Sequence, residues 1–291
     1  MTFHIKTLAK APKAWYNKYK AILKGDNTLA RDVVSAKLDI IFKKFFIENE
    51  DMLHSFVASM LDIPIESISE INITNPEIPP ESITGKFSRL DLNMKVDNRL
   101  VNVEIQVKNE PDYRDRVLFY WAKLYTSELK SGENYGELKQ AISINIINFN
   151  MFEGSNYHNE VNAVVKQTGE IFSDKLNIHF FELKKVNRQP NPQNSCELWL
   201  QFINADSEED FEMISQTNIP IMQKAVRVIY DMSEDTKIRE AARMREKMLH
   251  DEASALYNAE QKGRAEERVD IIKKMQSAGM TDEQINAIIG R

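Results

Sequence analysis

The sequence lacks most features that would assign it to a secreted, membrane or cofactor-binding class. Cys196 is its only cysteine in 291 residues, so an intramolecular disulfide is impossible, which fits a reducing, cytoplasmic compartment. No apolar run approaches membrane-spanning length, and Lys6, Lys10 and Lys13 interrupt the N-terminus before a signal-peptide pattern develops. No Gly-rich phosphate loop is present, so a nucleotide cofactor is not indicated. The histidines are scattered without metal-ligand spacing, which argues against zinc.

Acidic residues outnumber basic ones, 44 to 38. The net charge is −6, which counts against nucleic acid as a partner, because domains that bind it are more often basic. The exception is the stretch up to Lys24, where six lysines and no acid are interleaved with aromatic residues. This stretch fits an arm that grips phosphates, but a solvated, partly helical leader fits it somewhat better.

Apolar periodicity predicts helices on both sides of a group of strands. Residues 36–61 have the spacing of a helix pair, and Asp112–Lys130 that of an amphipathic helix with an apolar face of Val117, Leu118, Trp121, Leu124 and Tyr125. Between them, Pro76, Pro79 and Pro80 exclude a long helix in residues 64–86.

Four segments have the pattern of strands, and Ile71 with Ile73 suggests a fifth, short one. Ser88–Val96 and Leu100–Lys108 alternate strictly between apolar and polar residues, and Asp97-Asn98 suits a tight turn between them. Ala141–Phe149 is almost wholly apolar, as expected of a central strand, and Ile178–Val186 follows. The order of elements predicts an α/β fold with a mixed central sheet flanked by helices.

Three regions follow from these patterns: an N-terminal arm (1–35), the α/β domain (36–190) and a helical C-terminal region (191–291). From about Ile219 to Met275 the helical pattern is densely charged with both signs, which suits self-association into a homodimer. At the end, Gly279 separates two short helical patterns, with Thr281 as an expected N-cap. This end fits half of a helix-turn-helix or an oligomerisation tail.

The hairpin register brings two acids together. If Asp97 and Asn98 are the turn residues, paired positions sum to 195, so Asp91 faces Glu104 with Cβ atoms about 4.5–5.5 Å apart. Like charges directly opposite each other are destabilising unless something neutralises them, and a divalent cation would do so.

The same strand face continues with Gln106 and Lys108. Two acids, an amide and an ammonium suit Mg²⁺-assisted phosphodiester hydrolysis, although alternation by itself is also typical of the solvent-facing side of a hairpin. Arg114 and Arg116 begin the next helix, where phosphate-contacting groups would be useful, and Arg89 on the first strand is a further candidate for contacting DNA.

Many residues in order carry a family resemblance. They include Asp39-Ile40-Ile41-Phe42-Lys43-Lys44-Phe45-Phe46, Ser88-Arg89-Leu90-Asp91, Val103-Glu104-Ile105-Gln106, Pro111-Asp112-Tyr113, Tyr120-Trp121, Ile144-Asn145-Ile146, Glu182-Leu183 and Ser254-Ala255-Leu256-Tyr257. Over about residues 36–290 the chain resembles the PD-(D/E)XK nuclease family transposases, also called recombination-promoting nucleases.

The resemblance implies a restriction-endonuclease-like core, metal-dependent cleavage of DNA, and Asp91 and Glu104 as metal ligands. Gln106 stands where the wider superfamily has a catalytic lysine. Two replacements are open: Lys108 on the same strand face, or Lys43 from a helix, with Asp39 as a further acid. Asp39 and Lys43 equally fit an ordinary i,i+4 ion pair.

Two functions therefore remain open. The first is a Mg²⁺-dependent DNA endonuclease linked to recombination or mobile elements. The second is a DNA-binding or self-assembling protein with a decayed site, which the Glu-x-Gln motif and the acidic net charge keep open.

Overall fold

The computed structural model describes residues 33–74, 92–127, 129 and 132–289. The N-terminal arm up to residue 32, Arg89 and Asp91 lie outside the described residues. The chain divides into two compact units, Met1–Ala242 and Arg243–Arg291.

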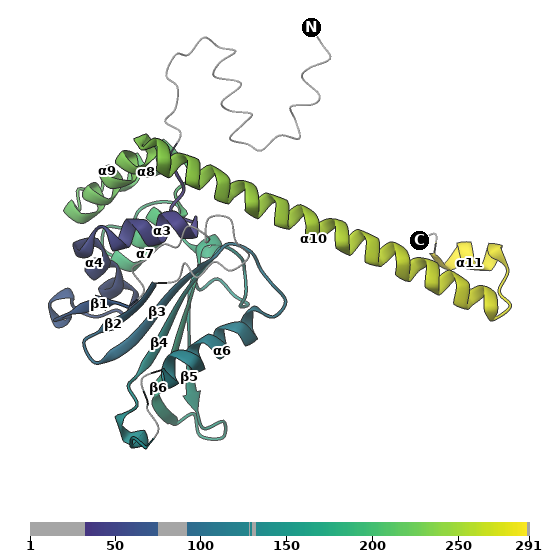
Figure 1. The fold of residues 1–291 in the computed structure, drawn as a ribbon, viewed down its shortest axis with the longest axis horizontal. Coiled ribbons are helices and arrows are strands. Elements are labelled where there is room, and N and C mark those ends of the chain that lie inside the picture. The colour runs from purple at the N-terminus through teal and green to yellow at the C-terminus, as the bar shows by residue number, and fades with distance from the viewer. Residues whose placement is uncertain (1–32, 75–91, 128, 130–131, 290–291) are drawn as a thin grey trace, which may run out of the picture. The chain divides into compact units, whose positions relative to one another are not determined.

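A six-stranded mixed sheet forms the centre of the first unit, as the sequence predicted, with the strand order β1-β2-β3-β4-β6-β5 (Figure 1). The pairs β1/β2, β2/β3 and β5/β6 are antiparallel, and β3/β4 and β4/β6 are parallel. The strands are β1 Ile71–Ile73, β2 Leu92–Val96, β3 Arg99–Gln106, β4 Ala141–Ile147, β5 His158–Val164 and β6 Ile171–Glu182. Every described residue of β4 is buried, which confirms its predicted central place.

The β2–β3 hairpin has the predicted turn and register. Leu92 pairs with Val103 and Val96 with Arg99, so paired positions sum to 195. Asp97 takes the positive φ, 52°, that the tight turn requires. Because Asp91 is outside the described residues, its pairing with Glu104 stays a prediction made from this register.

Two strand predictions need correction. β3 ends at Gln106, so Lys108 lies beyond the strand and alternation no longer fixes its face. The predicted strand Ile178–Val186 is the second half of a longer β6, and Leu183–Lys185 forms a 3₁₀ turn instead. β5 was missed, because this edge strand alternates only between exposed and half-buried residues and lacks a strong apolar pattern.

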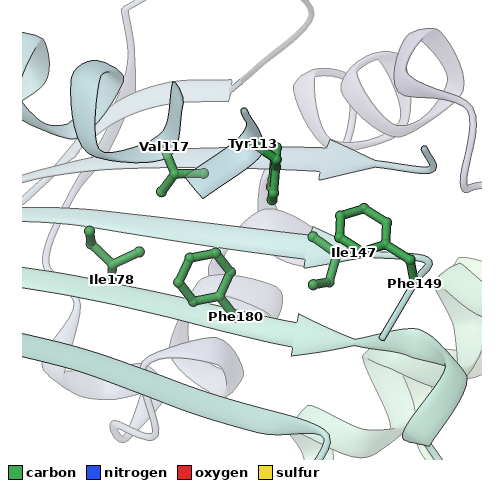
Figure 2. Close-up of a cluster of buried hydrophobic side chains, with 6 residues drawn as sticks. All are labelled: Tyr113, Val117, Ile147, Phe149, Ile178 and Phe180. Carbon is green, nitrogen blue, oxygen red and sulfur yellow. The ribbon is translucent and has the colours of Figure 1, made fainter. Parts of the chain in front are cut away.

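Helix α6 (Tyr113–Thr126) covers one face of the sheet. Its Tyr113 and Val117 pack on side chains of β4, of β6 and of the segment just after β4, as Figure 2 shows. These side chains are Ile147, Ile178, Phe180 and Phe149. The prediction that Leu118 belongs to this apolar face is wrong, since 47% of Leu118 is exposed. Leu118 is about 100° around the helix from Val117, so it points away from the sheet.

A layer of helices provides the remaining core. The predicted helix pair is present as α3 (Asp39–Ile47) and α4 (Glu50–Met60). The other helices of this layer are α7 (Ser195–Asn204), α8 (Glu208–Ser215) and α9 (Pro220–Glu234). Their aromatic side chains pack together: Phe45 lies 5.1 Å from Phe202 and 6.5 Å from Trp199 between ring centroids. α3 also packs against β3. The sheet face turned away from α6 is buried too, through Val101, Val103, Ile144 and Ile146.

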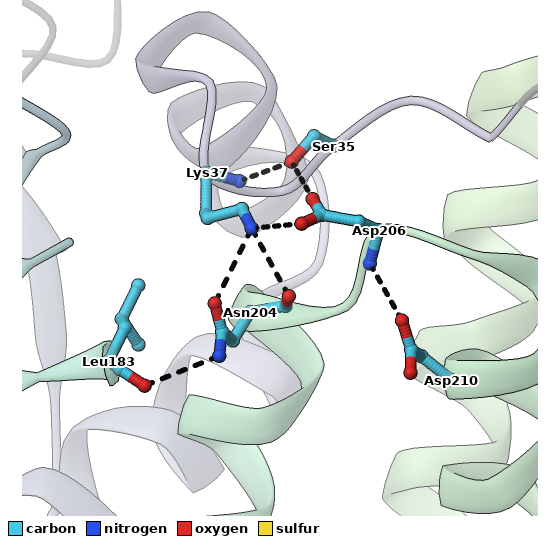
Figure 3. A network of polar contacts seen from close by, with 6 residues as sticks. All are labelled: Ser35, Lys37, Leu183, Asn204, Asp206 and Asp210. Atoms are coloured by element: carbon cyan, nitrogen blue, oxygen red, sulfur yellow. Dashed lines mark hydrogen bonds and ion pairs between the residues drawn. The ribbon is translucent and has the colours of Figure 1, made fainter. Parts of the chain in front are cut away.

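Polar contacts tie the chain before α3 to the α7–α8 connection (Figure 3). The Lys37 ammonium contacts Asp206 Oδ2 at 2.5 Å and donates to the Asn204 carbonyl at 3.2 Å, while the Ser35 hydroxyl donates to Asp206 Oδ1. Residues 191–242 thus belong to the same compact unit as the sheet.

The chain beyond Asp235 is helical, in agreement with the helical pattern expected from about Ile219 to Met275. α10 (Thr236–Ser277) is followed by α11 (Asp282–Ile289), and Gly279 between them has φ of 84°. Thr281 is the N-cap: its hydroxyl accepts from Gln284 N, and the Gln284 side chain accepts from Thr281 N at 2.9 Å, a capping box. Among the described helices, none is both long and apolar enough to cross a membrane.

Candidate active site

Glu104 is the described member of the predicted acid pair, and it lies in the middle of the sheet. It stands on β3 next to Asn145 of β4 in the parallel register, and alternation puts Gln106 on the same face. This is the face that α6 covers, because Tyr113 of α6 donates to Asn145 Oδ1 at 3.4 Å. The site thus forms where a helix start crosses a central strand.

Arg116 of α6 is the charged partner of Glu104. Its Nη2 donates to Glu104 Oε1 at 3.2 Å, and its Nη1 donates to Glu110 Oε2 in a close ion pair. The guanidinium also lies over the Tyr113 ring, 5.1 Å from the centroid. One cation therefore bridges two carboxylates, one on the strand and one on the loop that follows it.

The site is half-buried, which gives these charges weight. The Glu104 side chain is 13% exposed and that of Arg116 26%. Burial lowers the pKa of Arg116, but the charges of Glu104 and Glu110 oppose it, and the net shift in the pKa is upward. Arg116 consequently stays a cation beside the Glu104 carboxylate.

Buried polar groups continue inward from Glu104. Asn145 is fully buried, and its Nδ2 donates to the Ser143 hydroxyl and to the His179 carbonyl, each at 3.1 Å. With Tyr113 on its oxygen, the amide is held in one orientation beside the carboxylate of Glu104.

The Gln106 side chain contacts the backbone of Lys108, and the two side chains do not lie side by side on a strand. Gln106 Nε2 donates to the Lys108 carbonyl at 2.9 Å, just after β3 ends. This bond holds the Gln106 amide against the turn that leads to Glu110. The place of the Lys108 ammonium is therefore set by the loop and not by the sheet.

Asp39 and Lys43 lie on α3, the helix that packs on β3. Asp39 Oδ1 accepts from Ile40 N at 2.9 Å at the start of the helix, and Lys43 is only 1% exposed. Both alternatives for this pair, an active-site role and an ordinary ion pair, stay predictions.

Arg114 points to the other flank of α6. Its Nη2 donates to the Met151 carbonyl at 3.0 Å, and its guanidinium lies 5.5 Å from the Phe152 ring. Part of its role is thus to hold the loop after β4, and DNA contact by Arg114 stays a prediction.

The donors around Arg116 suit a hard cation. Carboxylate oxygens of Glu104 and Glu110 both turn toward one positive charge, and such oxygens are the ligands that Mg²⁺ prefers. Within residues 33–74, 92–127, 129 and 132–289, no group of three or more His, Cys, Asp or Glu is arranged to hold a metal.

Other reactive residues lie elsewhere. His158 and His179 share a hydrogen bond of 2.9 Å, and His179 pairs in register with Ile144, on the face turned away from Glu104. Burial and the neighbouring His158 lower the pKa of His179 to about 4. Burial raises the pKa of Cys196 to about 12, so its thiol packs and is not a nucleophile.

Sequence reasoning missed Glu110 and Asn145 and saw Arg116 only as a phosphate contact. Asn145 gave a signal, since it is a polar residue inside an apolar central strand. The bridge that Arg116 makes between Glu104 and Glu110 gave none, because it depends on how α6 docks on the sheet.

A family model described as PD-(D/E)XK nuclease family transposase matches residues 36–259, which include the whole described site. No curated protein and no solved structure matches the chain.

Proposed function

Because the chain belongs to the PD-(D/E)XK nuclease family transposases, we propose that it is a Mg²⁺-dependent DNA endonuclease acting in recombination or on mobile elements. Its reaction is hydrolysis of a phosphodiester bond. The observation that carries the proposal is the half-buried carboxylate of Glu104 on the central strand β3. The Arg116 guanidinium lies between this carboxylate and that of Glu110.

Glu104 and Asp91 would hold the metal, Asp91 as the resemblance implies. When bound, Mg²⁺ polarises the phosphoryl oxygen and lowers the pKa of a water molecule. The protein's own contribution is orientation: Arg116 and the strand hold the Glu104 carboxylate in one place, so little rearrangement is needed when the phosphate arrives.

The wider superfamily has a catalytic lysine where this chain has Gln106. In this protein the ammonium group comes instead from Lys108 or from Lys43. Lys108 is on the loop next to the Gln106 amide, and Lys43 is on the helix that packs against β3. Either one would stabilise negative charge that develops on the phosphate. Arg89, Arg114 and Arg116 are the proposed DNA contacts.

The alternative is a DNA-binding or self-assembling protein whose site has decayed. Gln106 is the observation that favours it, since an amide cannot supply the charge of a lysine. In both cases DNA is the partner, and the helices of the C-terminal unit would join two copies.

A plasmid assay separates the two. Supercoiled plasmid is incubated with the protein over a Mg²⁺ titration, and binding is followed separately by gel shift in EDTA. If the protein is an endonuclease, the wild type nicks the plasmid increasingly as Mg²⁺ is added. The Glu104→Gln variant binds the plasmid but does not nick it. Glu170→Gln removes an exposed charge on the β5–β6 turn and serves as the control. Binding without nicking by the wild type would favour the decayed site.

A further inference from the structure

Glu182 is a buried carboxylate in the same row of the sheet as Gln106 of the candidate site. In the parallel registers Gln106 pairs with Ile147 and Ile147 pairs with Glu182, so the three side chains share the face that α6 covers. Two strand spacings, about 10 Å, separate Glu182 from Gln106. The ion-pair partner of Glu182 is Lys185, at 2.6 Å, and the two side chains are 0% and 9% exposed. The proposed reaction gives neither residue a role.

The ion pair of Glu182 and Lys185 holds the loop between β4 and β5, residues 148–157. Glu182 Oε1 accepts from the backbone N–H groups of Met151, at 2.5 Å, and Phe152, at 3.3 Å. Lys185 Nζ donates to the Phe152 carbonyl at 2.7 Å. Two successive residues of the loop are thus fixed by one pair of buried charges.

The loop begins at the strand end of the candidate site. Its first residue, Asn148, donates its N–H to the Gln106 carbonyl at 2.9 Å. β3 ends at Gln106, and Glu104 lies two residues before that end on the same face. Whatever fixes the loop therefore also fixes the backbone where the Glu-x-Gln motif leaves the sheet.

The middle of the loop holds the first turn of α6. The Phe149 ring meets the Tyr113 ring edge to face, with 5.5 Å between the centroids (Figure 2). The Arg114 guanidinium donates to the Met151 carbonyl at 3.0 Å, and the N–H of Met151 is one of the groups that the ion pair holds. The same turn of α6 contains Arg116, which donates to the carboxylate of the site at 3.2 Å.

We propose that Glu182 and Lys185 are positioning residues of the candidate active site, acting through loop 148–157 on Arg116 and Glu104. The inference rests on the proposed function and adds to it two residues that lie outside the metal-binding carboxylates. A buried ion pair stabilises a fold little better than apolar side chains of the same size, so stability alone is a weak reason for this one. Its particular property is direction, because charged hydrogen bonds hold chosen peptide groups in one geometry. A misplacement of about 1 Å at a reacting centre can cost about a hundredfold in rate.

The first test removes both charges and keeps the volume of the side chains. In the full chain, Glu182→Gln combined with Lys185→Met leaves no unpaired charge in the interior, so we expect the protein to stay folded in a thermal unfolding experiment. The matched control is Lys184→Met, because Lys184 is the exposed neighbour of Lys185. Lys185→Arg keeps a cation in place and is the conservative variant.

Nicking is measured over a range of plasmid concentrations at saturating Mg²⁺, and binding in EDTA. We expect the variant with both changes to lower kcat about tenfold or more and to keep its binding within about threefold of the wild type, because binding sums many phosphate contacts whereas kcat depends on geometry at the site. Lys185→Arg should have an intermediate kcat, and Lys184→Met that of the wild type. An unchanged kcat in the folded double variant overturns the inference. So does a loss confined to binding, or an equal loss after Lys184→Met.

Hydrogen exchange followed by mass spectrometry gives a readout that does not depend on cleavage. In the double variant and in Lys185→Arg, amides of residues 148–157 should exchange faster than in the wild type, and those of residues 104–116 should do so as well. Faster exchange in the loop alone breaks the proposed link and overturns the inference. Lys185→Arg decides this point by itself if the double variant does not fold. If the wild type does not nick DNA, the proposed function fails, while exchange in residues 104–116 still decides whether the ion pair acts on the site.

Discussion

Arg116 of α6 donates a hydrogen bond of 3.2 Å to Glu104 of β3, so the helix start and the central strand are joined at the candidate site. Judged from the hairpin alone, Glu104 faces another acid, and its removal would relieve repulsion and keep or raise stability. The guanidinium reverses that expectation, because removing either partner now leaves a half-buried charge with less compensation.

Arg116→Ala should therefore lower the free energy of unfolding by about 1–2 kcal/mol, between the values for exposed and buried ion pairs. Arg116→Lys should recover only part of this, since an ammonium cannot bridge Glu104 and Glu110 as a planar guanidinium does. Urea unfolding of Arg116→Ala, of Glu104→Gln and of the variant with both changes gives the coupling free energy between the two side chains. Additive effects would show that the contact contributes nothing.

Glu182 should be more costly to alter than any residue of the site. It is fully buried, and it accepts from Met151 N at 2.5 Å, from Asn159 Nδ2 at 3.1 Å and from Lys185 Nζ at 2.6 Å. Glu182→Ala takes the acceptor from the Met151 and Phe152 N–H groups and leaves the Lys185 ammonium with only the Phe152 carbonyl and no counter-charge, so we expect a loss of about 3–5 kcal/mol in urea unfolding. The control is Glu153→Ala, because Glu153 is an exposed acid on the loop that contains Met151. Similar small losses in both variants would be contrary to this account.

Stability should fall with acid because of His179. Its pKa is lowered to about 4 in the folded protein, by burial and then by His158, whereas the unfolded chain titrates near 6.5. Between those values the unfolded state binds the additional proton, so stability is full above pH about 6.5 and declines toward pH 4, by about 3 kcal/mol in total. Folded His158 also has a lowered pKa, from burial, and acts in the same direction.

Urea unfolding at several pH values between 4.5 and 7 measures this slope. His179→Gln removes the titrating ring, so its stability should depend less on pH over this window than that of the wild type. An equally steep slope in the variant would assign the acid sensitivity to other groups.

The C-terminal helices should be separable from the core after Ala242 but not earlier. A chain ending near Thr217 loses α9, whose Met222, Val226 and Ile229 are buried in the first unit. We expect that shorter chain to be unfolded or aggregated, while a chain ending at Ala242 keeps a cooperative thermal transition. Light scattering then tests the proposed dimer: the chain ending at Ala242 should be monomeric where the full chain is dimeric. Equal masses would exclude the C-terminal unit as the dimer contact.

The parts of the fold that depend on local pattern could be predicted from the sequence. The alternation in β2 and β3 and the Asp97 turn determined the hairpin register, and the apolar run of β4 its central place. The strand β5 was missed because an edge strand needs no strong apolar face. Leu118 was misplaced because a short amphipathic helix allows more than one apolar face until its packing is known.

The candidate site was predictable only along the strand. Glu104 and Gln106 follow from alternation, the hairpin register put Asp91 opposite Glu104, and the family resemblance implied that both acids are metal ligands. The contact of Arg116 with Glu104 joins residues whose relation depends on the docking of α6 against β3 and β4, which no periodicity in the sequence encodes. Lys108 shows the converse failure, since alternation was extended past the point where β3 ends.

The most direct test of the central claim is nicking of supercoiled plasmid by wild type and Glu104→Gln over the same Mg²⁺ titration, with gel shift in EDTA confirming that both bind DNA. We predict Mg²⁺-dependent nicking by the wild type and, for Glu104→Gln, binding with nicking reduced by at least about a hundredfold, since loss of a metal-binding carboxylate removes the site's charge stabilisation. Equal nicking by the two proteins would contradict the assignment of Glu104 as the centre of the active site.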